Sequence, residues 1–569
     1  MHDPRSRPSD ADAGRPDTDR IERGPTRPLR VGLVVTPSDV RTWMVTLASL
    51  LEIDGIARLA AIIEVGPQVA AWLPRDAGPI QRAVVRLDDR LFSRPGAPLS
   101  VVDPDVVWPA VVRIDLTAAA PGADGLDERA AADLAGAQLD MLVQPVGRPL
   151  APLAAFARHG VWVFEHGDPD GTSMTPGLRA VLGADETLRS ELVAVTGDGR
   201  RMVLARTWSA PDLTSGRRSM DRILAKLAAF PARHAARLAR RPTATIEDLA
   251  LEPPKPVGRP RRRSPGAADR AIARALPGHL ARLLSRLPER LVWRQHWILA
   301  ELLDVPEDGF PDPRRYRSTI IEPPSGVSWA DPFPVEHDGA SLLFMEEWDY
   351  ATRKGRIALM TRAADGSWGD RRTVLERDVH LSYPFVFEWQ GEWYLMPEAM
   401  AGRTLDLFRA TDFPTRWTFD RHVMEGVQVA DATIAEIDGA WWLFAAIAQP
   451  GGASTDELHL FSGPGPLGPW RPHPANPIVS DVRSGRPAGR LFRHDGAWYR
   501  PSQDCTGRYG RAISLSRIDR LDLDGYAETV IDRIDPEWAP GGLGTHTLNR
   551  AGRSVLLDLS VKDRIGWRG

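Results

Sequence analysis

In the second half of the chain, apolar residues come in short runs that polar turns interrupt at regular distances. Each copy has an apolar strand, a tight turn that ends in glycine, and a second strand rich in aromatic residues. The turn glycines are Gly339, Gly391, Gly439, Gly496 and a shorter copy at Gly552. Successive glycines lie 52, 48, 57 and 56 residues apart. This spacing suits one four-stranded antiparallel blade a repeat and predicts a five-bladed β-propeller.

The repeat also predicts where a site should lie. The first strand of every blade lines the central channel, so the residues eight positions before the glycines should ring one funnel. These residues are Asp331, Tyr383, Asp431 and Ala488. The turns themselves carry Asp-Gly or Gln-Gly pairs, which supply the positive φ angles that two-residue hairpins need.

The first half of the chain alternates instead between buried-strand runs and helical spacing. Strand runs are predicted at residues 29–35, 56–65, 106–112, 141–144 and 161–164. Helical spacing separates them, and a hairpin is expected near residues 191–208. Strands that alternate with helices predict a doubly wound α/β sheet with mostly parallel strands. The chain is therefore expected to be multidomain.

Four regions follow from these patterns. Residues 1–28 are polar and proline-rich and predict a disordered tail. Residues 29–250 form the α/β domain, and residues 251–288 form a basic, proline-rich linker and a helix with a break at Pro277. Residues 289–569 form the propeller, in which the run from Trp293 to Leu302 predicts a strand that closes the last blade.

Composition excludes several classes of protein. A net charge of −3 gives no bulk attraction to nucleic acid. The single cysteine, Cys505, rules out an internal disulfide, and the absence of a Cys/His cluster predicts no metal site. No apolar run reaches the length of a transmembrane helix, and the N-terminus lacks a signal peptide's apolar core. We expect a cytoplasmic protein.

The α/β half resembles the formyltransferase fold, the group that contains methionyl-tRNA formyltransferase and the sugar N-formyltransferases. The resemblance rests on strand order and on residues 139–144 and 160–168. It implies formyltetrahydrofolate as a cofactor if this half is active, and a catalytic Asn, His and Asp. Only the histidine transfers cleanly, to His166. Gln144 lies near the position of the Asn, and neither Asp168 nor Asp198 is a secure match, so the triad is degenerate.

The propeller half resembles the N-terminal domain of plant glucosamine inositolphosphorylceramide transferase. The motifs are Trp329-Ala330-Asp331-Pro332-Phe333, Glu346-Glu347, Ser382-Tyr383-Pro384-Phe385, Pro397-Glu398, Asp431-Ala432-Thr433 and Gly544-Thr545-His546. The glycosyltransferase domain of that family has no counterpart in the sequence. The resemblance therefore implies the propeller fold and a function that involves carbohydrate, but it does not imply the transferase activity.

The blade layout is also similar to the furanosidase and arabinanase propellers, which place carboxylates on successive first strands. That resemblance implies catalytic roles for Asp331 and Asp431, with Glu347 or Glu398 as the general acid. Two carboxyl groups with separated pKa values are what glycoside hydrolysis needs. Sugar contacts are expected from Trp329, Tyr383, Arg490 and His546. The alternative is a structural role, in which a carboxylate on a first strand only accepts hydrogen bonds from backbone amides of the adjacent blade.

Three functions remain open on the sequence. The first is a carbohydrate-modifying protein whose propeller binds, and hydrolyses or transfers, a glycosyl unit of a nucleotide- or lipid-linked sugar. The second is a glycan-binding scaffold without enzymatic activity. The third is a sugar N-formyltransferase that uses formyltetrahydrofolate. Apart from that folate, no cofactor is assigned.

Overall fold

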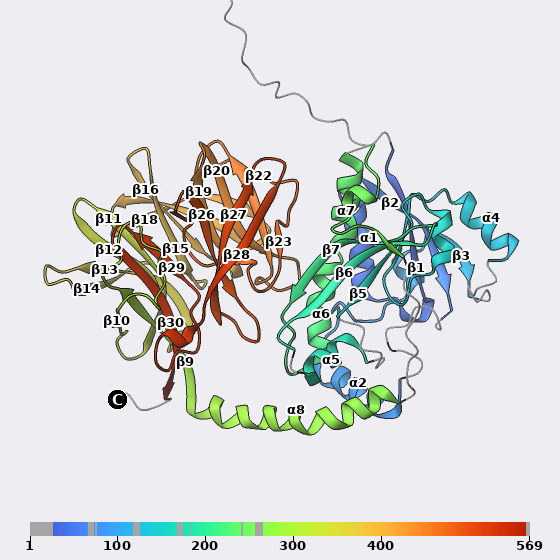
Figure 1. Cartoon of the computed structure of the whole chain (residues 1–569), viewed down its shortest axis with the longest axis horizontal. Coiled ribbons are helices and arrows are strands. Elements are labelled where there is room, and N and C mark those ends of the chain that lie inside the picture. The colour runs from blue at the N-terminus through green and yellow to red at the C-terminus, as the bar shows by residue number, and fades with distance from the viewer. Residues whose placement is uncertain are drawn as a thin grey trace, which may run out of the picture.

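The computed structural model describes residues 27–66, 73, 77–117, 126–167, 174–183, 185–240, 243–256 and 266–564. They form an α/β part and a β-propeller, which the long helix α8 (Ala267–Val292) joins along one side (Figure 1). The predicted disordered tail falls almost entirely on residues 1–26, which lie outside the described residues, as does the basic run of the linker at 257–265.

The α/β part is built on one mixed sheet of eight strands in the order β3-β2-β1-β4-β5-β6-β7-β8. The strands are β1 (Leu29–Val35), β2 (Ala57–Val65), β3 (Val112–Leu116), β4 (Met141–Gln144), β5 (Val161–His166), β6 (Leu188–Val195), β7 (Arg200–Ser209) and β8 (Lys255–Pro256). Within this order, the five strands from β3 through β2, β1 and β4 to β5 pair in parallel, whereas β5, β6, β7 and β8 pair antiparallel. The sheet is therefore less parallel than the sequence predicted, because its last strands form hairpins.

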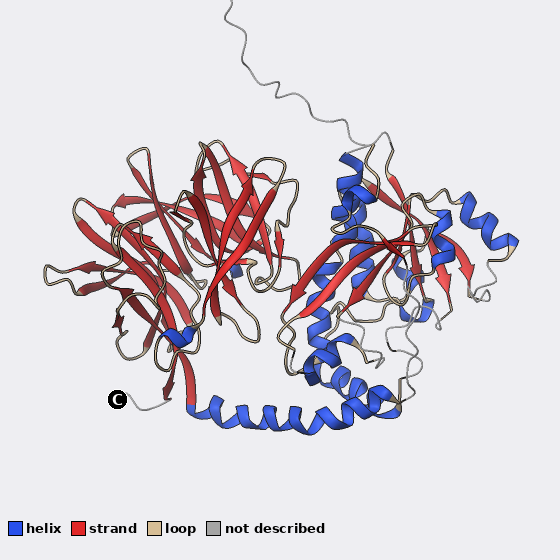
Figure 2. Cartoon of the chain, in the orientation of Figure 1, coloured by secondary structure: helices blue, strands red, loops and turns tan. Residues whose placement is uncertain are grey.

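Helices cover both faces of this sheet (Figure 2). They are α1 (Thr42–Glu52), α2 (Pro79–Phe92), α3 (Pro104–Val107), α4 (Glu128–Gly136), α5 (Pro176–Gly183), α6 (Gly216–Leu227) and α7 (Phe230–Arg240). One apolar core contains Trp43, Trp162 and Phe230, and a second on the other face contains Leu134 and Val163. Neighbouring residues Trp162 and Val163 enter opposite cores because side chains alternate along a strand.

The second part is a five-bladed propeller, as the repeat predicted. Blade 1 contains β11 (Val327–His337), β12 (Ala340–Asp349), β13 (Lys354–Arg362) and β14 (Trp368–Leu375). Blade 2 contains β15 (Ser382–Trp389), β16 (Glu392–Glu398), β17 (Thr404–Asp412) and β18 (Arg416–Glu425). Blade 3 contains β19 (Gln428–Ile437), β20 (Ala440–Ala448), β21 (Glu457–Gly463), β22 (Arg471–Pro472) and β23 (Val479–Ser480).

The last two blades complete the ring. Blade 4 contains β24 (Arg486–Pro487), β25 (Phe492–His494), β26 (Ala497–Asp504), β27 (Ala512–Leu521) and β28 (Tyr526–Ile534). Blade 5 contains β29 (Leu548–Ala551), β30 (Ser554–Arg564), β9 (Trp293–Leu302) and β10 (Ser318–Ile321). Pairing of β9 with β30 joins the start of the propeller to its end, so the predicted closing strand is confirmed.

The local signals of the repeat have clear structural counterparts. Asp338, Gln390, Asp438 and Asp495 have φ between 47° and 54° directly before their turn glycines, as predicted. A second left-handed residue stands at the same place in the first three blades: Asp331, Tyr383 and Asp431 have φ of 51°, 45° and 50°. Each marks a β-bulge where the pairing register shifts. From the bulge each of the three side chains contacts the next blade: Asp331 the Tyr383 amide, Tyr383 the Thr433 hydroxyl and Asp431 the Arg486 guanidinium.

Two other sequence expectations were wrong. The strand predicted at residues 106–112 begins only at Val112, because Asp103 caps the short helix α3 and its side chain accepts a hydrogen bond from the Asp105 amide. Helix α8 continues through Pro277, where a break was expected. No described helix is long and apolar enough to cross a bilayer.

Candidate functional site

A cavity of about 520 Å³ lies on the propeller axis, and its described lining residues come from all five blades. Its polar wall includes Glu346, Glu398, Arg486 and His546. Its aromatic wall is made of Trp297, Trp348, Tyr350 and Tyr509. Pockets of this size with aromatic walls and a few convergent polar groups are typical ligand sites.

Glu346, on β12 of blade 1, is the carboxyl group with the fewest partners in this cavity. His380 Nε2 lies 3.7 Å from Glu346 Oε1, beyond hydrogen-bond distance, and burial lowers the pKa of His380. Burial raises the pKa of Glu346 well above its ordinary value, and the negative charges of Asp331 and Glu398 add to this shift while His546 opposes it. The group is therefore suited to hold a proton where other glutamates are ionised.

Glu398, on β16 of blade 2, shares a buried guanidinium with Asp431 of blade 3. Arg486 Nη2 donates to Glu398 Oε2 at 2.9 Å, and Arg486 Nε donates to Asp431 Oδ2 at 2.5 Å. Burial raises the pKa of Asp431 to about 8, and the charge of Arg486 opposes the rise. One cation thus faces two carboxyl groups, and a single guanidinium neutralises only one full negative charge.

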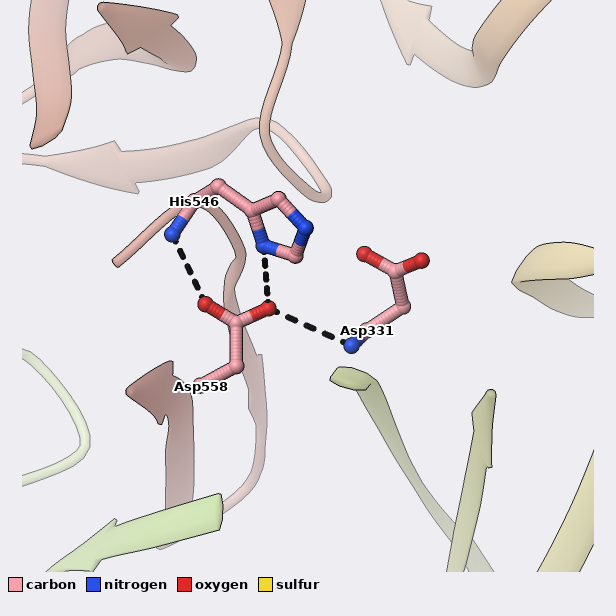
Figure 3. A group of neighbouring side chains, drawn as sticks. All are labelled: Asp331, His546 and Asp558. Carbon is pink, nitrogen blue, oxygen red and sulfur yellow. Dashed lines mark hydrogen bonds and ion pairs between the residues drawn. The ribbon is translucent and has the colours of Figure 1, made fainter. Parts of the chain in front are cut away.

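Asp331 and Asp558 form a second buried group with His546 (Figure 3). Asp558 Oδ1 accepts bonds from the His546 and Thr547 amides, and its Oδ2 lies 2.5 Å from His546 Nδ1 and accepts from the Asp331 amide. Asp331 in turn accepts bonds from the Tyr383 amide at 3.0 Å and from Thr547 Oγ1 at 2.6 Å. The carboxylates thus join blade 5 to blade 1 and blade 1 to blade 2.

The same three side chains offer atoms within 4.8 Å of one another, which is close enough for a metal ion. All four carboxylate oxygens of Asp331 and Asp558 accept N–H or O–H donors. The three side chains therefore form a hydrogen-bonded network that orients His546.

His546 presents a cationic imidazole to the cavity. Although burial lowers its pKa, the charge and hydrogen bond of Asp558 together with the charge of Asp331 raise it to about 9. The ring stacks on Trp297 with centroids 4.2 Å apart and meets Tyr509 edge-on at 5.3 Å. These contacts fix the ring plane while it lines the cavity.

Glu347 and Trp329, both expected at the site, lie away from the cavity. Glu347 is fully buried, accepts a bond from Trp329 Nε1 at 3.0 Å, and binds the guanidinium groups of Arg356 and Arg371. The reason is the alternation of side chains along β12, which sends Glu346 and Trp348 toward the cavity and Glu347 to the other face.

Tyr383 and Arg490, expected to contact sugar, do not line the cavity; Tyr383 is buried and Arg490 is half-buried. The Tyr383 hydroxyl bonds to Thr433 Oγ1 at 2.7 Å and accepts from the Gly489 amide at 2.8 Å, joining blades 2, 3 and 4. Arg490 donates to the carbonyls of Pro334 and Val386, and its guanidinium lies over the Phe333 ring at 5.1 Å. Both residues stabilise the channel.

In the α/β part, the residues suggested by the formyltransferase resemblance have structural partners. Gln144 Nε2 donates to the carbonyls of Val146 and Arg148, and its Oε1 accepts from the Leu150 amide at 3.0 Å. His166 Nδ1 lies 2.9 Å from Ser190 Oγ, and burial lowers the pKa of His166 to about 4. Asp198 binds Arg200 in the exposed β6–β7 turn, and Asp168 lies outside the described residues.

Sequence reasoning missed two central residues. Glu346 lies seven residues after Gly339, as Glu398 lies seven after Gly391, so equal spacing within the repeat was the available signal. Arg486 had no such signal. It stands ten residues before Gly496, where the other blades carry Trp329, Leu381 and Val429. Its role depends on two carboxylates from other blades.

The fold and site define a five-bladed propeller with an acidic, aromatic-walled axial cavity. Residues 321–537 match the family described as "Glucosamine inositolphosphorylceramide transferase 1, N-terminal", in agreement with the resemblance seen in the sequence. Glucosamine inositolphosphorylceramide transferase 1 of Oryza sativa subsp. japonica is 38% identical over 207 residues, and the protein of that name from Arabidopsis thaliana is 35% identical over 206 residues. The match covers 36% of this chain but only 28% and 27% of those proteins.

Among solved structures, similarity is found to glycoside hydrolases. The GH43_1 enzyme from Xanthomonas citri has a TM-score of 0.32 and 16% sequence identity, covering 42% of this chain and 88% of that one. A family 117 glycoside hydrolase from Zobellia galactanivorans has a TM-score of 0.29 and 15% identity, covering 42% and 85%.

Proposed function

We propose that the propeller binds a glycosyl unit in its axial cavity and hydrolyses or transfers it, with Glu346 as general acid and Glu398 as the partner carboxylate. One observation carries the proposal: both groups open into the same cavity with opposite environments. Glu346 has a raised pKa and no hydrogen-bond donor among the described residues, whereas Glu398 is bound by Arg486.

This pair has the division of labour that glycoside chemistry needs. A protonated carboxyl group donates its proton to the oxygen of the leaving group, and an ionised carboxylate serves as nucleophile or activates a water molecule. Arg486 donates a charge-assisted hydrogen bond from Nη2 to Glu398 Oε2 at 2.9 Å, which places a positive charge beside this carboxyl group. Trp297 and Trp348 on the cavity wall offer aromatic surface to a sugar ring.

The curated relatives carry glucosamine and inositolphosphorylceramide in their names, so glucosamine and inositol phosphate derivatives are the first ligands to test. The experiment is calorimetric titration of the full chain with glucosaminides, inositol phosphates, furanosides and nucleotide sugars, followed by product analysis. Binding with turnover that Glu346→Gln removes supports the proposal. Binding by wild type without any product contradicts the catalytic part.

A second candidate is glycan recognition without chemistry. It is favoured by the use of Asp331 and Asp431, the two carboxylates expected on the first strands, in joining the blades. Under this alternative, Glu346→Gln changes affinity, and wild type gives no product with any sugar. Formyl transfer is less well supported, because Gln144 is occupied by loop atoms and His166 is neutral at physiological pH.

A further inference from the structure

Three segments of the propeller carry cavity residues and also contact the α/β part. Segment 449–457 carries Ser454 and Thr455, segment 481–486 carries Arg486, and segment 505–511 carries Tyr509. They come from blades 3 and 4, next to β7, α6 and the loop before β6. The described lining residues of the cavity itself all belong to the propeller.

Segment 449–457 is held by a buried ion pair. Lys226 of α6 donates from Nζ to Thr207 Oγ1 at 2.7 Å, Ser209 Oγ at 2.5 Å and Asp456 Oδ2 at 2.5 Å. The side chains of Lys226 and Asp456 are each 3% exposed. The other oxygen, Asp456 Oδ1, is buried without a hydrogen-bond partner among the described residues. Lys226 is thus the main counter-charge of this carboxylate.

A second pair supports the same segment: the guanidinium of Arg233, on α7, binds both oxygens of Glu457 at 2.7 and 2.8 Å. The effect reaches Arg486 as well, since Arg486 Nη1 donates to Ser454 Oγ at 3.3 Å. A shift of segment 449–457 would therefore disturb the cation that binds Glu398.

The other two segments have their own contacts with the α/β part. The Val482 amide donates to the Trp208 carbonyl of β7 at 3.1 Å, and Arg483 lies over the Trp208 ring at 4.7 Å. The Cys505 amide donates to the Val482 carbonyl at 3.0 Å, which links the third segment to the second. Arg511 Nη1 lies 2.6 Å from Glu186 Oε1.

From these contacts we infer that the α/β part positions one wall of the propeller cavity, with Lys226, Trp208 and Glu186 as positioning residues. The inference holds whichever ligand the cavity takes, because it rests on the contacts of the wall segments alone. It gives the α/β part a role in the site without requiring any chemistry of its own.

Hydrogen exchange of the full chain, followed by mass spectrometry, tests this inference. Lys226→Met leaves the Asp456 carboxylate buried and uncompensated, so peptides from 449–457 should exchange about tenfold faster or more, and those from 481–486 should follow. Peptides from β11 to β18 in blades 1 and 2 should keep their wild-type rates. The single cysteine, Cys505, gives a second readout, because loosening of its segment exposes the thiol to a disulfide reagent such as DTNB.

Lys255→Met is the matched control, because Lys255 forms an exposed ion pair with Glu252. It lies on β8, which pairs with β7 at Arg200 and Arg201, at the opposite end of β7 from Trp208. It should change neither exchange nor thiol labelling in the three segments. Unchanged exchange in a folded Lys226→Met protein would overturn the inference, as would an equal rise in all five blades. If Lys226→Met does not fold, Glu186→Gln at the surface decides instead: faster exchange confined to 505–511 supports the inference, and no change overturns it.

Discussion

The α/β part and the propeller differ in how their polar side chains are used. In the α/β part, Gln144 is saturated by backbone atoms of its own loop and His166 is neutral and bonded to Ser190. In the propeller, Glu346 faces a 520 Å³ cavity without a hydrogen-bond donor among the described residues. Polar groups with several hydrogen bonds stabilise a fold, whereas an acid that faces a cavity without a hydrogen-bond donor is available to bind or react.

The largest effect should come from Glu346→Gln, which removes the proposed acid while keeping its shape. Turnover of a glycoside that wild type cleaves should fall by about 10²- to 10⁴-fold. In wild type, turnover should decline as the pH rises through the pKa of Glu346, which burial raises well above its ordinary value of 4.5, and the variant should lack this decline.

Steady-state rates across pH measure both effects. Glu388→Gln, an exposed carboxylate on β15, is the matched control and should behave as wild type. If His166→Asn reduces sugar turnover as much as Glu346→Gln, the proposed difference between the two parts is wrong, because the reactive group would then lie in the α/β part.

Arg486→Met should cause the largest loss of stability. It leaves Glu398 and Asp431 buried beside each other without their shared cation, which should reduce the free energy of unfolding by about 3–5 kcal/mol. Urea unfolding of the full chain measures this loss. Arg493→Met, on an exposed position of the same blade, should change stability little. If Arg486→Met loses no more stability than the control, Arg486 is not the counter-charge of the two carboxyl groups and the prediction is wrong.

His546 should make the stability of the propeller depend on pH. Its pKa is raised from 6.5 to about 9, so the folded state binds more protons than the unfolded state in this range. Stabilisation by the charged ring is complete below pH 6.5 and is lost as pH rises through about 9. The full difference is roughly 3 kcal/mol. Unfolding free energies of wild type and His546→Gln should converge at high pH, and parallel curves would contradict the prediction.

The smallest effect is expected from a buried residue of the α/β part, Gln144. Gln144→Ala removes the three hydrogen bonds of a buried side chain, so it should destabilise the chain by about 2 kcal/mol without changing sugar binding. Thermal unfolding and calorimetry of the same sample check both outcomes. Affinity of wild type for a folate analogue, lost in His166→Ala, would contradict the structural role assigned to this half.

The number of blades and the conformation of their turns could be predicted from the sequence. The glycine spacing predicted five blades, and the residue pairs at the turns predicted their left-handed φ angles, because both depend on residues close together in sequence. The same repeat located Asp331, Asp431 and Glu398 on the strands that converge at the axis. The location of the protein in the cell and the boundaries of its domains remain predictions.

Only the tertiary structure decided which carboxyl groups are free. Asp331 accepts a hydrogen bond from the Tyr383 amide across a blade boundary, and Asp431 of blade 3 and Glu398 of blade 2 both bind Arg486 of blade 4. Likewise, Lys226 donates a hydrogen bond to Asp456, which lies 230 positions later in the sequence. A sequence fixes the period and the local turns, but the partner of a buried charge is set by which distant strands close the ring, and that partner determines whether a carboxylate stabilises the fold or remains available for chemistry.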